Sequence, residues 1–220
     1  METAPSLPLR YVRLVLGLAC FAAGTTLTLW AELGLSPWDV LHDGLRLNTP
    51  LTFGTATIVV GAALILVSLI GGVRPGPGTL ANMVLIGVFV DLFLASGLGD
   101  GIGNEHVALR AATTLAGVAV IGLGSALYIG AELGAGPRDS LMVTVATRGK
   151  MRVGIARTIT EGSALIAGIL LGGKVGVGTI LFVVTIGPAV DIAFRIFRMD
   201  SSGHRDRPLS EAPEQIATIP

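Results

Sequence analysis

The sequence predicts an all-α polytopic membrane protein with six transmembrane helices, built as two inverted three-helix repeats that each carry a short extra half-helix. Of its 220 residues, 51% are hydrophobic and only 14% are charged, whereas soluble domains average about 25% charged. Several uncharged apolar runs reach the roughly 20 residues that a membrane-spanning helix needs. In addition, the first half of the chain recurs in the second half.

The repeat is clearest in two copies of Ala-Glu-Leu-Gly, at residues 31–34 and 131–134, each followed by a proline and an aspartate. The offset of 100 residues continues on both sides without gaps. Matching residues include Arg10 and Arg110, Gly17 and Gly117, Gly24 and Gly124, Gly54 and Gly154, and Ile86-Gly87 and Ile186-Gly187. One register kept over about eighty residues indicates a tandem duplication.

Repeat one covers residues 1–98, with spans expected at about 9–31, 52–70 and 79–96. Ser36-Pro37 predicts the start of a short helix over about 37–47, because Ser is a frequent N-cap and Pro suits the first helical position. That helix is too short to span. It would lie in the membrane interface or enter the bilayer as a half-helix. Its apolar stripe consists of Trp38, Leu41 and Leu45, and its polar side consists of Asp39, His42, Asp43 and Arg46.

Repeat two follows a polar linker at 99–106 and has the same plan. Its expected spans cover about 107–130, 153–171 and 178–197, and its expected short helix covers about 137–147. Residues 199–220 are polar and contain proline, which predicts a disordered cytoplasmic tail.

The positive charges predict the orientation, because short cytoplasmic loops are rich in Lys and Arg. With the N-terminus inside, the inner side holds Arg10, Arg13, Arg74, Arg138, Arg148, Lys150, Arg152, Arg198, Arg205 and Arg207, and the outer side holds Arg46, Arg110 and Lys174. Both termini are therefore expected in the cytoplasm, with the protein in the plasma membrane. Each repeat has three spans, so the second copy would enter the bilayer from the opposite side.

Several motifs resemble the YczE/YyaS/YitT-like family of bacterial integral membrane proteins. They are A-E-L-G-x-x-P-W-D-x-L-x-x-G-L at 31–45, G-x-G-T at 76–79 and I-G-x-x-x-D at 86–91. The likeness covers roughly residues 10–198. In the second copy Arg138 replaces the Trp, and the Asp-Gly-Leu end of the short helix is missing. The resemblance implies a membrane protein and no particular substrate.

Asp91 and Asp191 lie at equivalent places within apolar spans. A carboxylate there costs roughly 2.5–3.5 kcal/mol on insertion scales, so each should face the bundle interior or water. Two interpretations stay open. The aspartates form a proton or cation site, or they bond a neighbouring helix or cap a helix end.

Glu32 and Glu132 end a span, where a negative charge opposes the helix dipole. In one interpretation, each glutamate, together with Asp39 or Asp139, binds a cation or faces the following half-helix. In the other, its carboxylate holds the turn by accepting backbone N–H groups.

Three further features have two interpretations each. Gly78-Thr79 and Gly178-Thr179 open spans, where free N–H groups favour an anion or where Thr simply caps a tight turn. Glu161, which has Gly61 as its equivalent, is either a substrate-specific charge or the partner of Arg157 in an ion pair.

We expect no enzyme, no cofactor and no metal site. The stretch Gly168 to Lys174 lacks the Ser or Thr of a phosphate-binding loop, and the Gly-x-Gly-Asp at 97–100 lies in the linker. Cys20 is a lone small residue in an apolar run, and the zero net charge gives no reason to expect nucleic acid as a partner.

The expected function is that of a secondary transporter or exporter of a small polar or charged solute, with the bilayer and that solute or ion as its partners. The alternative is a non-transporting membrane module, a substrate-capturing subunit or scaffold that acts with a partner membrane protein, whereas a homodimer would fit the transporter.

Overall fold

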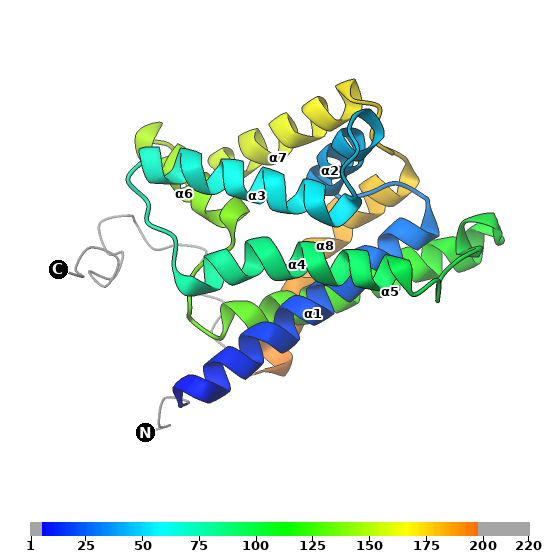
Figure 1. Ribbon diagram of the computed structural model, residues 1–220, viewed down its shortest axis with the longest axis horizontal. Coiled ribbons are helices and arrows are strands. Elements are labelled where there is room, and N and C mark those ends of the chain that lie inside the picture. Colours follow the sequence, from blue (N-terminus) through cyan, green and yellow to red (C-terminus); the bar gives the residue numbers. More distant parts are fainter. Residues whose placement is uncertain (1–5, 198–220) are drawn as a thin grey trace.

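The computed structural model describes residues 6–197, which form helices and no strand. The helices are α1 (Leu7–Ala31), α2 (Pro37–Asn48), α3 (Phe53–Ile70), α4 (Pro77–Ala95), α5 (Val107–Ile129), α6 (Pro137–Arg148), α7 (Val153–Leu170) and α8 (Val177–Ile196), with a 3-10 turn, η1 (Ile102–Asn104), between α4 and α5 (Figure 1). Among these residues, 6 helices are long and apolar enough to cross a membrane. The protein is therefore an all-helical membrane protein, and the expected tail at 199–220 lies outside the described residues.

The helix bounds agree with the expected spans and short helices to within two residues. Helix α1 begins at Leu7, two residues earlier than expected, with proline in its first turn. Proline is tolerated there because the first N–H groups of a helix have no intrahelical acceptor. The linker contains the 3-10 turn η1, which the sequence did not indicate.

The helices form two layers (Figure 1). In one layer, α1 and α5 pack side by side, with α4 against α1 and α8 against α5. In the other layer, α2, α3, α6 and α7 each contact two neighbours of that layer and close a ring. Each repeat thus contributes two helices to each layer, and the main buried cluster joins residues of both repeats, most of them from repeat one.

Helices α1 and α5 are held close by glycines at equivalent positions. A Cβ on Gly24 would lie 2.5 Å from the carbonyl oxygen of Gly117, and one on Gly124 would lie 2.7 Å from that of Gly17. Only glycine permits this separation, as in other small-residue contacts between membrane helices. The two helices run antiparallel, since the start of each contacts the end of the other.

Two arginines complete this contact in the same way at its two ends. Arg10 donates from Nε to the carbonyl oxygen of Ala131 at 2.7 Å, and Arg110 donates from Nε to that of Ala31 at 2.9 Å. Each guanidinium also bonds the next carbonyl oxygen, on Glu132 or Glu32. Each arginine thereby satisfies carbonyl groups at the end of the opposite helix, which otherwise have no partner.

Helix α2 begins as the sequence predicts, and its polar side faces inward. The backbone N–H of Asp39 donates to the Ser36 hydroxyl at 3.2 Å, and Pro37 occupies the first turn. Asp39, His42 and Asp43 are buried, because α2 packs between α3 and α7. The polar side of α2 therefore lies within the bundle.

The layers are joined unequally on their two sides. Helices α3 and α4 pack closely, whereas the equivalent α7 and α8 hardly touch. At the α3–α4 contact, a side chain on Gly54 would overlap the carbonyl oxygen of Gly87. At the equivalent positions on α7 and α8, nothing lies within 4 Å of the Cβ positions of Gly154 and Gly187. The space between the layers is therefore closed along α3 and α4 and open along α7 and α8.

Candidate functional site

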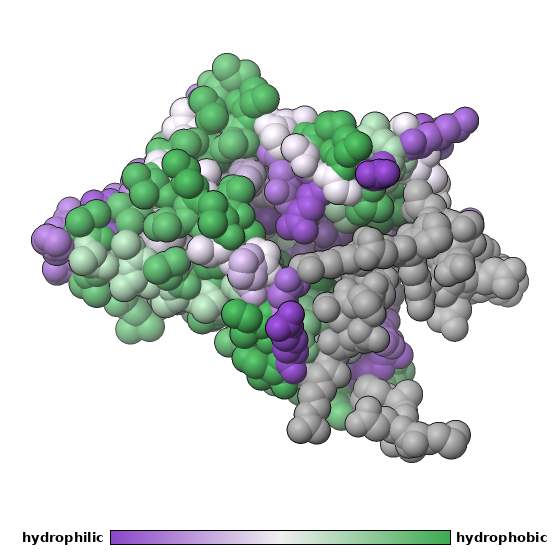
Figure 2. Space-filling view, turned by 180° about the vertical axis from the view of Figure 1, so that it is seen from behind, coloured by the Kyte–Doolittle hydropathy of each residue, from purple (hydrophilic) through white to green (hydrophobic). Residues whose placement is uncertain are grey.

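The space between the two layers forms a cavity of about 400 Å³ lined by all eight α-helices. Seen from behind, hydrophilic surface is exposed in a hollow between hydrophobic regions (Figure 2). The polar lining includes Ser36, His42, Thr57, Asn82, Ser125, Tyr128, Arg138, Asp139, Arg157, Thr160 and Glu161. A cavity of this size, mostly apolar with a few convergent polar groups, suits a small ligand.

The beginnings of the two short helices meet at this cavity. Trp38 follows the first proline of α2, and Arg138 follows the first proline of α6. The Arg138 guanidinium carbon lies 5.6 Å from the centroid of the Trp38 ring, within the range of a cation–π interaction. The same guanidinium lies 3.5 Å from Asp39 Oδ1, so Arg138 joins α6 to α2.

Asp39 contacts three polar side chains, those of Ser36, His42 and Arg138. Its Oδ2 accepts from the Ser36 hydroxyl at 2.5 Å, and its Oδ1 lies 3.3 Å from His42 Nδ1. Burial raises the pKa of Asp39, but the bond from His42 and the charge of Arg138 outweigh burial and hold this pKa below its usual value of 3.8. Asp39 is therefore a carboxylate near neutral pH.

The contacts of His42 define its neutral form. Its Nδ1 also lies 3.2 Å from the Thr57 hydroxyl, whose own proton goes to the carbonyl oxygen of Phe53 at 3.0 Å. The Thr57 hydroxyl and the Asp39 carboxylate therefore both act as acceptors toward His42 Nδ1. The neutral imidazole of His42 then carries its proton on Nδ1. Burial is the main cause that lowers the pKa of His42 below 6.5, and Arg138 adds to it, while Asp39 opposes it.

The second half of the cavity carries its own charged groups. The Tyr128 hydroxyl donates to Asp139 Oδ2 at 3.3 Å, and Arg157 Nε donates to Glu161 Oε1 at 2.9 Å. The i,i+4 ion pair expected from the sequence is thus present. Asp139 and Glu161 both line the cavity, and a binding role for either residue stays a prediction.

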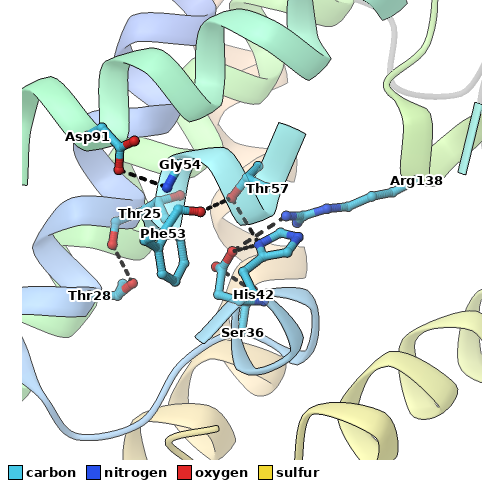
Figure 3. A network of polar contacts seen from close by, with 10 residues as sticks. Thr25, Thr28, Ser36, His42, Phe53, Gly54, Thr57, Asp91 and Arg138 are labelled. Carbon is cyan, nitrogen blue, oxygen red and sulfur yellow. Dashed lines mark hydrogen bonds and ion pairs between the residues drawn. The ribbon is translucent and has the colours of Figure 1, made fainter. Parts of the chain in front are cut away.

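Asp91 lies outside the cavity, at the contact between α3 and α4 (Figure 3). Its Oδ1 accepts from the backbone N–H of Gly54 at 2.8 Å, and its Oδ2 accepts from the Thr52 hydroxyl at 2.5 Å. Asp91 therefore caps the N-terminus of α3 and helps hold α3 to α4. Asp191 is also absent from the described cavity lining. An ion-binding role for either residue stays a prediction.

Glu32 and Glu132 also lie away from the cavity lining. Both residues adopt the left-handed backbone conformation with φ of 54°, which ends α1 and the turn after α5. Glu32 Oε2 pairs with Lys174 Nζ at 2.9 Å, and Glu132 Oε2 lies 3.7 Å from the Arg10 guanidinium. With side chains 50% and 83% exposed, both form surface ion pairs at opposite ends of the α1–α5 pair.

The starts of α4 and α8 contact the Glu-Leu-Gly turns of the opposite repeat. The N–H of Gly78 donates to the carbonyl oxygen of Leu133 at 2.8 Å, and that of Gly178 donates to Leu33 at 2.7 Å. Thr79 Oγ1 donates to the carbonyl oxygen of Ala135 at 2.6 Å, and Thr179 Oγ1 accepts from the N–H of Gly176 at 3.3 Å. These donors are occupied by the protein itself.

Three residues of the site were not among the candidates from the sequence. The sequence places Arg138 only among the inner-side charges, His42 only on the polar side of the short helix, and Asn82 only within an apolar span. Each had a signal: a charge where the repeat has Trp, a histidine one turn after Asp39, and an amide within hydrocarbon. Within residues 6–197, no group of three or more His, Cys, Asp or Glu is placed to hold a metal ion.

Comparison with known proteins identifies relatives along most of the chain. The uncharacterized membrane protein YczE of Bacillus subtilis is 38% identical over 185 residues, covering 82% of this chain and 83% of that protein. An uncharacterized protein of Haemophilus influenzae is 35% identical over 185 residues, 83% of this chain and 82% of its own length. The uncharacterized protein YyaS of Bacillus subtilis is 26% identical over 176 residues, 80% of this chain and 87% of that protein.

These relatives confirm the resemblance to YczE and YyaS that the motifs indicate. No solved structure matches the chain. Residues 8–195 match the family of unknown function DUF6198. The chain therefore belongs to this family, which includes YczE-like membrane proteins.

Proposed function

We propose that the protein is a secondary transporter or exporter of a small polar or charged solute, working by alternating access of two inverted repeats in the bacterial plasma membrane. The observation that carries the proposal is the difference between two equivalent contacts. Gly54 and Gly87 are packed together, whereas Gly154 and Gly187 face open space. One scaffold thus has one side of its central cavity closed and the equivalent side open, which is what alternating access requires of a single state.

The inverted arrangement is supported by the reciprocal contacts of α1 and α5. Arg10 and Arg110 bond the opposite helix ends in the same way, as two halves related by an axis in the membrane plane would. The excess of Lys and Arg on one side supports cytoplasmic termini. With that orientation, Asp91 closes the outer side of the cavity and the opening between α7 and α8 lies toward the cytoplasm.

The two layers provide the moving parts of this mechanism. Rocking of α2, α3, α6 and α7 against α1, α4, α5 and α8 would bring Gly154 to Gly187 and separate Gly54 from Gly87. The Asp91 bonds to Gly54 and Thr52 would break in that step. Of the acidic candidates, Asp139 and Glu161 line the cavity and would lie at the solute. Asp39 lies behind the lining as the partner of Arg138, and Asp91 and Asp191 would govern the two gates.

Cysteine labelling tests the proposal without knowledge of the solute. Cys20 is the only cysteine, so Cys20→Ser gives a background free of thiols. Ile58 packs against Gly87 at the closed contact, and its equivalent Thr158 is exposed. We expect Thr158→Cys to react with a membrane-impermeant maleimide from the cytoplasmic side and Ile58→Cys from the outer side. Cross-linking Thr158→Cys to Gly187→Cys should increase the labelling of Ile58→Cys.

A static module gives a different result. If Ile58→Cys stays unreactive in every condition, or reacts from the same side as Thr158→Cys, alternating access is ruled out. The non-transporting alternative would then be preferred, and co-purification with a partner membrane protein would support it. Reporter fusions after residues 34 and 134 provide the topology control, since the proposal requires the two turns on opposite sides of the membrane.

A further inference from the structure

The cavity extends further into repeat two than into repeat one. In repeat two its lining includes residues of α5 and α8, namely Ser125, Tyr128, Gly187 and Val190. The equivalent residues of repeat one are buried and are not part of that lining: Thr25, Thr28, Gly87 and Val90. The same face of the bundle is therefore open in one repeat and covered in the other.

Thr25 is the covered residue that fits its surroundings least. It is only 2% exposed, and its Oγ1 has no hydrogen-bond partner, which within residues 6–197 holds for no other buried side-chain nitrogen or oxygen. The neighbouring threonines of α1 do have acceptors. The hydroxyl of Thr26 donates to the carbonyl oxygen of Ala22 at 2.9 Å, and that of Thr28 donates to the carbonyl oxygen of Thr25 at 2.8 Å (Figure 3). A buried hydroxyl without a partner is rare and destabilises the packing that buries it.

Ser125 shows where the equivalent hydroxyl lies on the open side. It occupies the same position on α5 and lines the cavity, which water or a solute can enter. The helix contacts account for the difference, since α3 packs against α4 whereas α7 and α8 hardly touch. Separation of α3 from α4 would uncover Thr25 in the way that the gap between α7 and α8 uncovers Ser125.

We propose that Thr25 is the counterpart of Ser125 in the solute path: its hydroxyl lines the cavity when the cavity opens between α3 and α4, and there hydrogen-bonds water or the polar solute. This inference rests on the proposed function and assigns a solute-facing residue to the state that opens outward. The cost of the unpaired hydroxyl belongs only to the state in which α3 packs against α4, so Thr25 favours the opening of that contact. Ser125 would be covered in the opposite state and favours the opposite change.

Single cysteines test whether Thr25 reaches the cavity. In the Cys20→Ser background, we expect Ser125→Cys to react with a membrane-impermeant maleimide from the cytoplasmic side and Thr25→Cys from the outer side. Cross-linking Thr158→Cys to Gly187→Cys should increase the labelling of Thr25→Cys. Thr26→Cys is the matched control and should stay unreactive from both sides, because Thr26 is 0% exposed and its hydroxyl is bonded within α1.

A second set of variants tests the hydroxyl itself. Valine has the shape of threonine without the hydroxyl, so Thr25→Val should stabilise the state closed between α3 and α4. We expect it to raise Tm and to slow the labelling of Ile58→Cys from the outer side about tenfold. Ser125→Ala should accelerate that labelling. Thr26→Val removes a bonded hydroxyl and should neither raise Tm nor change the labelling.

The outcomes distinguish this inference from the proposed function. If Ile58→Cys reacts from the outer side and Thr25→Cys does not, the transporter stands and Thr25 is not in its path. A rise in Tm for Thr25→Val without slower labelling of Ile58→Cys would also overturn the role of Thr25, and so would an equal effect of Thr26→Val. If Ile58→Cys never reacts from the outer side, the transporter and the role of Thr25 fall together.

Discussion

Trp38 and Arg138 are equivalent residues of the two repeats, and in the folded chain the Arg138 guanidinium lies over the Trp38 ring, 5.6 Å from its centroid. The two repeats thus differ in residue type at a position where they meet, and the contact is one between a cation and an aromatic ring. Because the same guanidinium also faces Asp39, this single difference brings a positive charge to a buried carboxylate.

Removal of Arg138 should destabilise the protein through Asp39. In Arg138→Met the buried carboxylate loses its opposite charge, and we expect a loss of about 1–3 kcal/mol in the free energy of unfolding. Thermal or denaturant unfolding in detergent measures it. Asp39→Asn should cost less in the Arg138→Met background than in the wild type, since the charge that needs a partner is gone. Equal costs in both backgrounds would contradict the coupling.

The equivalent glycines of α4 and α8 should respond differently to the same substitution. Gly87→Val places a side chain against Gly54 and Ile58, and overpacking of this kind costs about 1–3 kcal/mol. Gly187→Val is the matched control. Because nothing lies within 4 Å of its Cβ, we expect a change within about 0.5 kcal/mol. If the gates alternate, Gly187→Val should nevertheless reduce the labelling of Ile58→Cys from the outer side, because it obstructs closure of α7 on α8.

The stability of the protein should fall as the pH drops below about 6.5. The pKa of His42 is lowered in the folded chain by burial, so the unfolded chain binds the proton first, and acid favours unfolding. One such proton contributes a slope of up to about 1.4 kcal/mol per pH unit. His42→Gln should reduce the slope of unfolding free energy between pH 6.5 and 5. Asp39→Asn should retain it, because the lowered pKa of Asp39 places that titration below this range.

The arginine contacts at the ends of α1 and α5 should matter more than the acidic side chains beside them. Arg10→Ala and Arg110→Ala each leave two carbonyl groups without their guanidinium, at a cost of about 1–3 kcal/mol. Lysine should rescue only in part, because it lacks the planar fork. The exposed Glu132→Gln and Arg74→Ala should be nearly neutral in the same unfolding measurement. A cost for Glu132→Gln equal to that for Arg10→Ala would show that the surface ion pair holds the turn.

Much of the fold followed from the sequence because it depends on local signals. The spans come from uninterrupted apolar runs, and the start of α2 comes from Ser36 and Pro37, whose roles are set by neighbouring residues. The site did not follow as readily. Arg138 has the same local context as a cytoplasmic loop charge, and only the packing of α6 against the other repeat brings it to Asp39.

The difference between the α3–α4 and α7–α8 contacts could not be read from these glycines. Gly54 and Gly87 are identical to Gly154 and Gly187, so residue type gives both contacts the same preference. The packing of the whole bundle decides which contact is close. Asp91 and Asp191 illustrate the same limit: their equivalence predicts a shared role, whereas the bonds of Asp91 to Gly54 and Thr52 belong to the closed side.

The pairing of α1 with α5 also bears on how the chain is made. Helix α1 leaves the ribosome about a hundred residues ahead of its main partner, a delay of roughly 5–20 s at usual rates of synthesis. During that interval Arg10 has no helix end to bond, and Gly17 and Gly24 have no neighbour to approach. The newly inserted N-terminal half must therefore wait in the lipid, incompletely packed and dependent on whatever protects it, until translation delivers the rest.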